Sequence, residues 1–199
     1  MMKRLRHAIV VVIVILAVTA LGSCNFLGLG NHMNIDGTRY DLDAFYVVYE
    51  GTEAGVHGLA LIFTSQGLNL TDQGPTGSGE LLGLFVISPS RDLAGGNYEF
   101  NYALAPFVLW YGWAGIEYNA NTDDARTWYE ITGGSVKVRE ALRDNYVFDF
   151  DFKGVRDGAP EGSPLIEITG RFRGPIDRTF DDSIVGSELP LQGKFRFAP

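Results

Sequence analysis

Few side chains in this chain of 199 residues have the types and the spacing that catalysis requires. Asp149 and Asp151 stand two residues apart in an alternating segment, so their Cα atoms would lie roughly 7 Å apart on one strand face, as in a glycosidase pair. If this segment pairs with the next predicted strand, the same two carboxylates lie beside Glu167, Thr169 and Arg171 in a solvated charge patch. We favour the charge patch, because exposed carboxylates lack the burial that raises a pKa toward that of a general acid.

Histidine chemistry is equally sparse. Outside the first 23 residues the histidines are His32 and His57, and His57 precedes an apolar alternating strand. We interpret His57 as a hydrogen-bonded structural histidine rather than a catalytic base or a ligand-binding group. The chain contains neither a GxSxG elbow nor an HExxH motif. We therefore predict no catalytic residue, no enzymatic activity and no cofactor.

One polar segment has the oxygen spacing of part of a calcium loop. Asn119, Asn121 and Asp123 occupy alternate positions, and Glu130 follows eleven residues after Asn119. The segment begins with Asn rather than Asp, and Asp124 stands where the loop needs its turn glycine. We interpret it as a polar hairpin tip and predict no metal site.

The aromatic segment over residues 107–115 (FVLWYGWAG) is the least ordinary part of the chain. Period-two alternation would send Tyr111 and Trp113 to one face and Trp110 to the other. A central strand packed on both sides is one interpretation. The alternative gives one face to a ligand or partner, because Trp and Tyr provide large rigid contact areas with a polar tip. Trp110, Tyr111 and Trp113 are therefore our candidate ligand-binding residues.

Hydrophobic periodicity predicts strands along the rest of the chain and no convincing helix. Alternation over residues 98–104, 146–153 and 191–197 predicts half-buried strands, whereas residues 59–63, 81–87 and 107–116 are apolar on both sides. Further strands are predicted over residues 35–42, 44–49, 127–131, 135–140 and 165–173. Glycine pairs at 95–96 and 133–134 suggest tight turns between them. The sequence thus predicts an all-β fold, a mostly antiparallel sandwich or flattened barrel of about ten or eleven strands, with a closed calycin-like barrel as the alternative.

The first 23 residues have the pattern of a secretory leader. Lys3, Arg4 and Arg6 precede residues 8–21, a run of 14 residues without a charge. At about 1.5 Å per residue this run is too short for a hydrocarbon core of about 30 Å. It is therefore more typical of the apolar region of a signal peptide than of a permanent membrane helix.

Leu21, Gly22, Ser23 and Cys24 follow this run and resemble a bacterial lipobox. The resemblance implies a signal peptide over residues 1–23 and a lipoprotein whose Cys24 carries a thioether-linked diacylglycerol and an amide-linked acyl chain such as palmitate. Each acyl chain would bury many methylene groups at about 0.8 kcal/mol per group, so the protein would be anchored stably in the membrane. Asn25 is not the Asp that favours inner-membrane retention in some diderm bacteria, so an outer-membrane location is implied. We expect residues 24–33 to form a tether and residues 34–199 a single domain.

The charge balance excludes one class of partner. Without the three leader cations the chain keeps 13 basic and 24 acidic residues, a net charge of −11. Such a chain repels phosphate backbones, so we predict no nucleic-acid partner. Cys24 is the only cysteine, so the domain must hold together without an internal disulfide.

The strand and turn pattern resembles that of small all-β bacterial surface lipoproteins. The likeness rests on residues 35–42 (IDGTRYDL), 130–136 (EITGGSV) and 168–172 (ITGRF), and it implies no catalytic residue. We expect a lipid-anchored envelope domain that binds a small apolar or glycan ligand, or a protein partner. The alternative is a structural or assembly component of the envelope without a small-molecule site.

Overall fold

The computed structural model of the chain describes residues 30–141 and 145–181. The chain divides into two units, Met1–Asn31 and His32–Pro199, and the fold belongs to the second. The leader, Cys24 and the strand predicted over residues 191–197 lie outside the described residues. Within the described ranges, no helix is long and apolar enough to span a membrane.

The described part of the chain is all-β, as the sequence predicts. Its twelve strands are β1 (His32–Ile35), β2 (Thr38–Asp41), β3 (Ala44–Glu53), β4 (Val56–Thr64), β5 (Leu68–Thr71), β6 (Gly74–Ser88), β7 (Gly96–Phe100), β8 (Val108–Asn119), β9 (Asp124–Glu140), β10 (Asn145–Arg156), β11 (Ile166–Pro175) and β12 (Arg178–Asp181).

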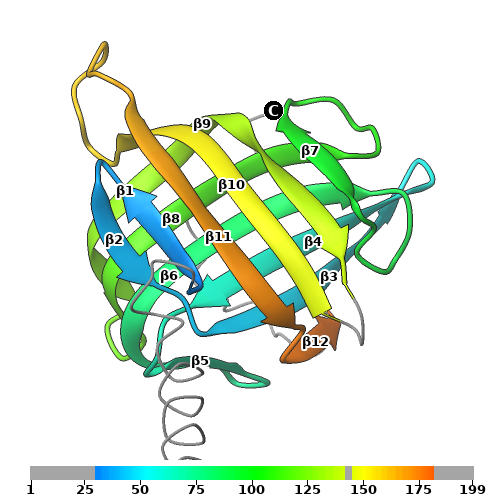
Figure 1. The fold of residues 1–199 in the computed structure, drawn as a ribbon, viewed down its shortest axis with the longest axis horizontal. Coiled ribbons are helices and arrows are strands. Elements are labelled where there is room, and N and C mark those ends of the chain that lie inside the picture. The colour runs from blue at the N-terminus through cyan, green and yellow to red at the C-terminus, as the bar shows by residue number, and fades with distance from the viewer. Residues whose placement is uncertain (1–29, 142–144, 182–199) are drawn as a thin grey trace, which may run out of the picture. The chain divides into compact units, whose positions relative to one another are not determined.

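One curled sheet contains almost all of these strands. Its order is β12-β3-β4-β6-β8-β7-β9-β10-β11-β1-β2, with β5 paired to β6 off this path and an additional pairing between β8 and β9. The β3–β12 and β7–β8 pairs are parallel, and the other described pairs are antiparallel. In Figure 1, β9, β10 and β11 cross in front of β3, β4, β6 and β8. Within residues 30–141 and 145–181 the sheet is a half-barrel whose outermost strands are β12 and β2, which agrees with the predicted flattened barrel or sandwich.

The sheet has two halves, one formed by β3, β4, β6 and β8 and the other by β9, β10 and β11. The inner faces of these two halves share one core. Phe63 of β4 lies at its centre, where its ring centroid is 4.7 Å from Phe45, 4.9 Å from Phe148 and 5.3 Å from Phe172. Phe148, Phe150 and Phe152 of β10 are all buried in this cluster. The alternation predicted over residues 146–153 is therefore confirmed, because every second residue of β10 points into the core.

The first predicted strand, over residues 35–42, is instead the hairpin of β1 and β2. Asp36 and Gly37 turn it with φ angles of 49° and 78°, the left-handed values of a two-residue hairpin turn. β1 begins at His32, and Met33 is fully buried in the core. The sheet thus begins inside the segment that the sequence assigns to the tether over residues 24–33.

Two other segments also differ from prediction. β7 ends at Phe100, so Tyr102 and Leu104 lie in an exposed loop, at 70% and 38% exposure, rather than in a strand. Residues 127–131 and 135–140 belong to one strand, β9, and Gly134 continues it with a φ of 106° instead of turning it. A Cβ at Gly134 would lie 2.1 Å from the carbonyl oxygen of Asp151, so the glycine permits close contact with β10 two residues from the bulge at Thr132. Nothing in the periodicity pointed to the short strands β5 and β12.

Candidate functional site

The outer face of β3, β4, β6 and β8 is apolar, which is unusual for a face that points away from the core. The inward residues of β4 and β6, such as Leu61 and Leu84, join the main core. Their outward neighbours, such as Ile62 and Leu81, form a second buried cluster with Trp113. The runs over residues 59–63 and 81–87, which the sequence shows to be apolar on both sides, therefore belong to strands that are covered on both faces.

Aromatic side chains lie over glycines on this outer face. A Cβ at Gly83 would be 2.2 Å from the Trp113 ring, and a Cβ at Gly115 would be 2.7 Å from the Trp128 ring. The Trp113 and Trp128 rings meet edge to face with centroids 5.4 Å apart. These glycines therefore make room for indoles that pack flat on the sheet.

A bulge brings the three candidate aromatic residues to the same face. β8 pairs Tyr111 with Phe85 and Leu109 with Val86, which leaves Trp110 as an extra residue opposite β6. Leu109 points into the main core, whereas Trp110 packs with Val108 and Ile87 on the outer side. The prediction that Trp110 faces away from Tyr111 and Trp113 is therefore wrong, because a bulge resets the alternation.

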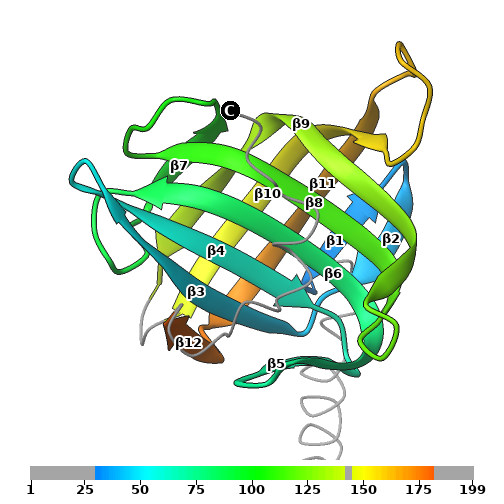
Figure 2. The same ribbon diagram turned by 180° about the vertical axis from the view of Figure 1, so that it is seen from behind.

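An open groove of about 230 Å³ lies at one end of this outer face. Its apolar wall contains Phe85 and Trp110, whose rings meet edge to face at 6.3 Å, and Leu104 of the β7–β8 loop. The end of the β3–β4 hairpin closes the other side with Glu50 and Glu53. Figure 2 shows the tip of this hairpin and the β7–β8 loop projecting on the same side of the sheet. The remaining lining residues are Gly51, Thr52, Val56, Gly58 and Ile87.

The three sequence-predicted residues have different positions relative to the groove. Trp110 lines it and is half-buried. Tyr111 stacks on Phe85, with centroids 5.1 Å apart and planes at 7°. Trp113 is only 6% exposed and belongs to the second cluster. Of the three, only Trp110 is placed where a ligand in the groove would touch it.

The charged side chains that line the groove are acidic. Its ten lining residues contain two carboxylates, Glu50 and Glu53, and no basic side chain. Burial raises the pKa of the neighbouring Tyr111 hydroxyl to about 12, and the Glu50 carboxylate contributes to the same shift. The tyrosine therefore stays neutral at physiological pH, and the groove combines an aromatic wall with an anionic rim.

Several residues of this groove were missed by sequence reasoning. Glu50 and Glu53 lie beyond the end of the strand predicted over residues 44–49, and Leu104 comes from a loop that was predicted as strand. The only signal for Phe85 was its place in the apolar run over residues 81–87. Grouping these residues requires the pairing of β4 with β6 and of β6 with β8.

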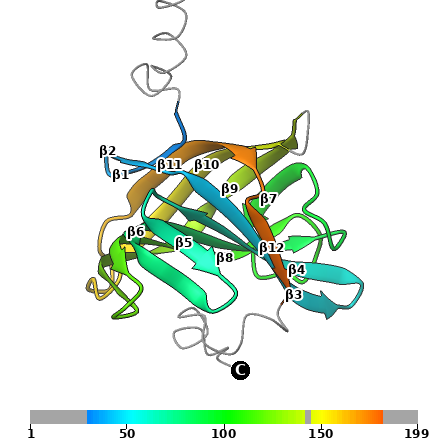
Figure 3. The same ribbon diagram turned by 90° about the horizontal axis from the view of Figure 1, so that it is seen from below.

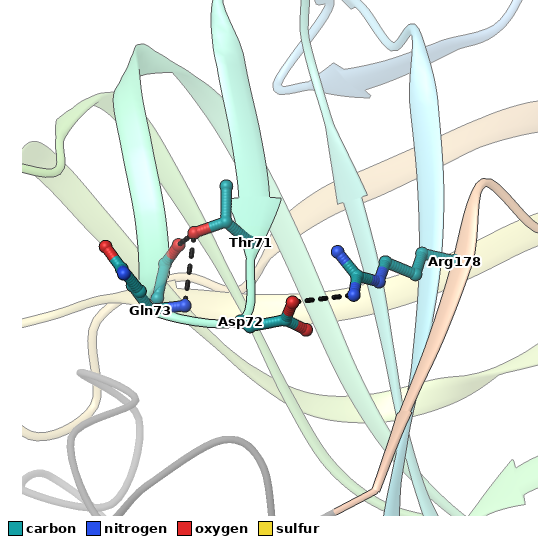
Figure 4. A network of polar contacts seen from close by, with 5 residues as sticks. Thr71, Asp72, Gln73 and Arg178 are labelled. Atoms are coloured by element: carbon teal, nitrogen blue, oxygen red, sulfur yellow. Dashed lines mark hydrogen bonds and ion pairs between the residues drawn. The ribbon is translucent and has the colours of Figure 1, made fainter.

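Short strands cover the second cluster beside the groove. Leu68 and Leu70 of β5 and Phe180 of β12 are buried in it. Arg178 of β12 pairs with Asp72 at the β5–β6 turn at 2.7 Å, and its guanidinium lies over the Phe180 ring at 5.0 Å. Figure 4 shows this bridge next to the turn bonds of Thr71 and Gln73. Figure 3 shows β12 beside β3, with β5 on the same side of the sheet.

The carboxylate pair is the charge patch that the sequence favours. Asp149 lies opposite Arg171, and Asp151 lies opposite Thr169. The Asp149 carboxylate accepts from Arg139 at 2.5 Å and pairs with Arg171 at 3.1 Å, and all three side chains are more than 40% exposed. Asp149 is thus paired with two exposed arginines, which is the arrangement of a solvated charge patch.

The histidine and the calcium-like segment also have structural roles. His57 Nδ1 lies 3.1 Å from the Thr52 hydroxyl and 3.4 Å from the Tyr49 hydroxyl, as expected for a hydrogen-bonded structural histidine. Residues 119–124 connect β8 to β9 as a hairpin tip, where Asn119 accepts from the Asn121 amide. The Tyr118 hydroxyl donates to Asp123 at 3.0 Å, so that carboxylate already has a partner.

Within the ranges 30–141 and 145–181, no group of three or more His, Cys, Asp or Glu residues is arranged to hold a metal ion. The candidate site is thus the open groove, with Trp110, Phe85 and Leu104 on one side and two carboxylates on the other. Comparison of the chain with protein-family models, with curated proteins and with solved structures found no match.

Proposed function

We propose that this chain is a lipid-anchored binding domain of the bacterial cell envelope. It is held through Cys24 to the outer membrane rather than to the inner membrane. Its role is non-enzymatic: it binds a small apolar or glycan ligand, or a protein partner, through the groove beside Trp110. The observation that carries the proposal is the open groove lined by Trp110, Phe85 and Leu104. Exposed aromatic walls of this kind supply contact area to ligands at low entropic cost.

The composition of the groove narrows the ligand chemistry. The apolar wall favours an aliphatic or aromatic body, or the apolar face of a sugar ring stacked on the Trp110 indole. Glu50 and Glu53 favour a neutral or cationic end and disfavour an anionic one, because like charges repel in a partly desolvated site. Anionic lipid headgroups are therefore the least suitable ligands among envelope molecules.

Binding can be tested with the neutral fluorescent probe N-phenyl-1-naphthylamine and the Cys24→Ser form of the chain. We expect saturable binding that Trp110→Ala weakens about tenfold, because one buried aromatic contact contributes roughly 1.4 kcal/mol or more. Tyr102→Ala is the matched control, since Tyr102 is an exposed aromatic outside the groove lining. Equal binding by the two variants would contradict the assignment of the groove.

A second candidate function is supported by the burial of Trp113. This residue is 6% exposed under the cover of β5 and β12, as a purely structural envelope component would require. Absence of binding by neutral apolar probes, sugars and cationic amphiphiles would favour this alternative over a binding module.

The anchor is tested separately from the groove. We expect the wild-type chain to partition with membranes and Cys24→Ser to be released in soluble form, because the lipid supplies the membrane affinity. Mass spectrometry of the mature N-terminus should show the acyl chains on Cys24. Tight membrane association of the Cys24→Ser chain would contradict the lipid anchor.

A further inference from the structure

The chain leaves the described sheet beside the groove. β12 runs parallel to β3, and its last residue, Asp181, pairs with Tyr49. Glu50 is the next residue of β3, and residues 50–53 line the groove. Because the two strands run in the same direction, β12 points toward the groove end of β3 where it ends at Asp181.

The residues that follow have a composition that matches the groove. Leu191, Phe195 and Phe197 alternate with Gln192, Lys194 and Arg196. Their apolar side chains match the wall formed by Phe85 and Trp110, and their two cations match Glu50 and Glu53. The long stems of Lys and Arg can bend toward a rim carboxylate while the aromatic side chains face the wall.

The connection is long enough for this placement. Nine residues, 182–190, separate β12 from the alternating segment, and they can span up to about 30 Å. Four strand spacings of about 4.8 Å, or about 19 Å, separate β12 from β8 on the far side of the groove. The segment can therefore reach every wall of the groove.

We propose that residues 191–197 are a built-in occupant of the groove, with Phe195 and Phe197 against Phe85 and Trp110 and with Lys194 and Arg196 beside Glu50 and Glu53. The inference rests on the groove being the binding site proposed above. It makes the C-terminal segment an intramolecular competitor that an external ligand must displace. A tethered segment acts at a millimolar effective concentration, so even weak intrinsic affinity keeps the groove occupied.

Zero-length carbodiimide cross-linking of the full-length Cys24→Ser chain tests this arrangement. After the leader, the only lysines are Lys137, Lys153 and Lys194, so each cross-link can be assigned by mass spectrometry. We expect Lys194 to be joined to Glu50 or Glu53 within one monomer. Lys137 lies opposite Asp149 and serves as the internal positive control. Lys194 joined only to carboxylates of β10 or β11, or not joined at all, would overturn the proposal.

Paired variants check that the aromatic side chains hold the segment in place. Phe195→Ser with Phe197→Ser keeps Lys194 and should lower the yield of its cross-link to the groove about tenfold, whereas Gln192→Ser should leave it unchanged. Unchanged yield in the double variant would contradict the arrangement. Cross-links found only between two copies of the chain would assign the groove to a second copy and would also overturn an intramolecular occupant.

Probe binding provides a second measurement that needs no cross-link. Lys194→Gln with Arg196→Gln should raise the affinity for N-phenyl-1-naphthylamine about fivefold to tenfold, because the competitor is weakened. Unchanged affinity in this variant, together with strong probe binding by the wild-type chain, would reject the intramolecular occupant and keep the proposed function. Intramolecular Lys194 cross-links to the groove, without probe binding by any variant, would keep the occupant and reject the proposed function.

Discussion

The two halves of the curled sheet bury the same kind of inner face but present opposite outer faces. Outside β10 and β11, Asp149, Asp151 and Arg171 form an exposed charged surface. On the outer side of β4, β6 and β8, the side chains of Ile62, Leu81 and Trp113 are buried in a cluster that includes residues of β5 and β12. A strand therefore does not have to be polar on its outer side when another part of the same chain covers it.

The difference between the halves also explains where a ligand site can form. On the charged half, the outer side chains form solvated ion pairs, so that face offers little apolar surface for a ligand to bury. On the apolar half, the cover by β5 and β12 ends before Phe85 and Trp110, which remain half-buried at the groove. A binding surface arises at this incomplete edge of the cover, because apolar contact area is still available there.

The largest effect should come from removing the indole at the centre of the covered face. Trp113→Ala should lower the free energy of unfolding by about 3 to 5 kcal/mol, because it opens a large cavity beneath the cover. Val147→Ala, on the outer side of β10, should cost less than about 1 kcal/mol. Urea unfolding of the two variants measures the contrast, and similar losses would mean that the two outer faces are equally solvated.

A smaller effect is expected from adding one methyl group under that indole. Gly83→Ala should cost about 1 to 3 kcal/mol by overpacking, because the new Cβ would lie 2.2 Å from Trp113. Gly133→Ala on β9 is the matched control, since its Cβ would meet nothing within 4 Å. We expect that variant to unfold at the wild-type urea concentration or slightly above. A neutral Gly83→Ala would show that the outer cover is loosely packed.

Alkaline pH should test burial on both faces through tyrosine ionisation. Burial raises the pKa of Tyr98 in the main core and of Tyr111 on the outer face from 10.0 to about 12. Their neutral forms therefore stabilise the fold fully below pH 10, and this contribution is lost as the pH rises through 12. At pH 11 each should contribute a loss of about 1 kcal/mol, measured by urea unfolding at a series of pH values.

Phenylalanine variants assign the alkaline loss to each face. Tyr111→Phe should remove part of the loss between pH 10 and 12 without affecting the part due to Tyr98. Tyr98→Phe should remove the other part, and at neutral pH it should also lose the 2.8 Å hydrogen bond from its hydroxyl to the Ala94 carbonyl. An unchanged pH profile in Tyr111→Phe would indicate that the outer face is open to water.

The smallest effect is expected on the charged face. Asp149→Asn should cost no more than about 0.5 kcal/mol, because its pairs with Arg139 and Arg171 are exposed and solvent screens them. The loss should shrink further as salt is added, since exposed charges are screened over about 10 Å at 0.1 M. A large loss that does not depend on salt would show that this face is not solvated as described.

The sequence by itself determined the strand character, the inner face of β10 and the solvated charge patch around Asp149. These features depend on alternation within single segments, which a strand fixes at a period of two. The same reasoning recognised that residues 59–63, 81–87 and 107–116 are apolar on both sides. It also selected Trp110 among the candidate residues.

Only the tertiary structure decided what covers the second face and where the groove lies. The bulge that turns Trp110 to the side of Tyr111 depends on the register between β6 and β8, which neither strand encodes alone. Similarly, β12 is four residues long and becomes a strand by pairing with β3, more than a hundred residues earlier in the chain. Local periodicity shows which residues share a face, but partners that are distant in the sequence determine whether that face meets water, other chain segments or a ligand.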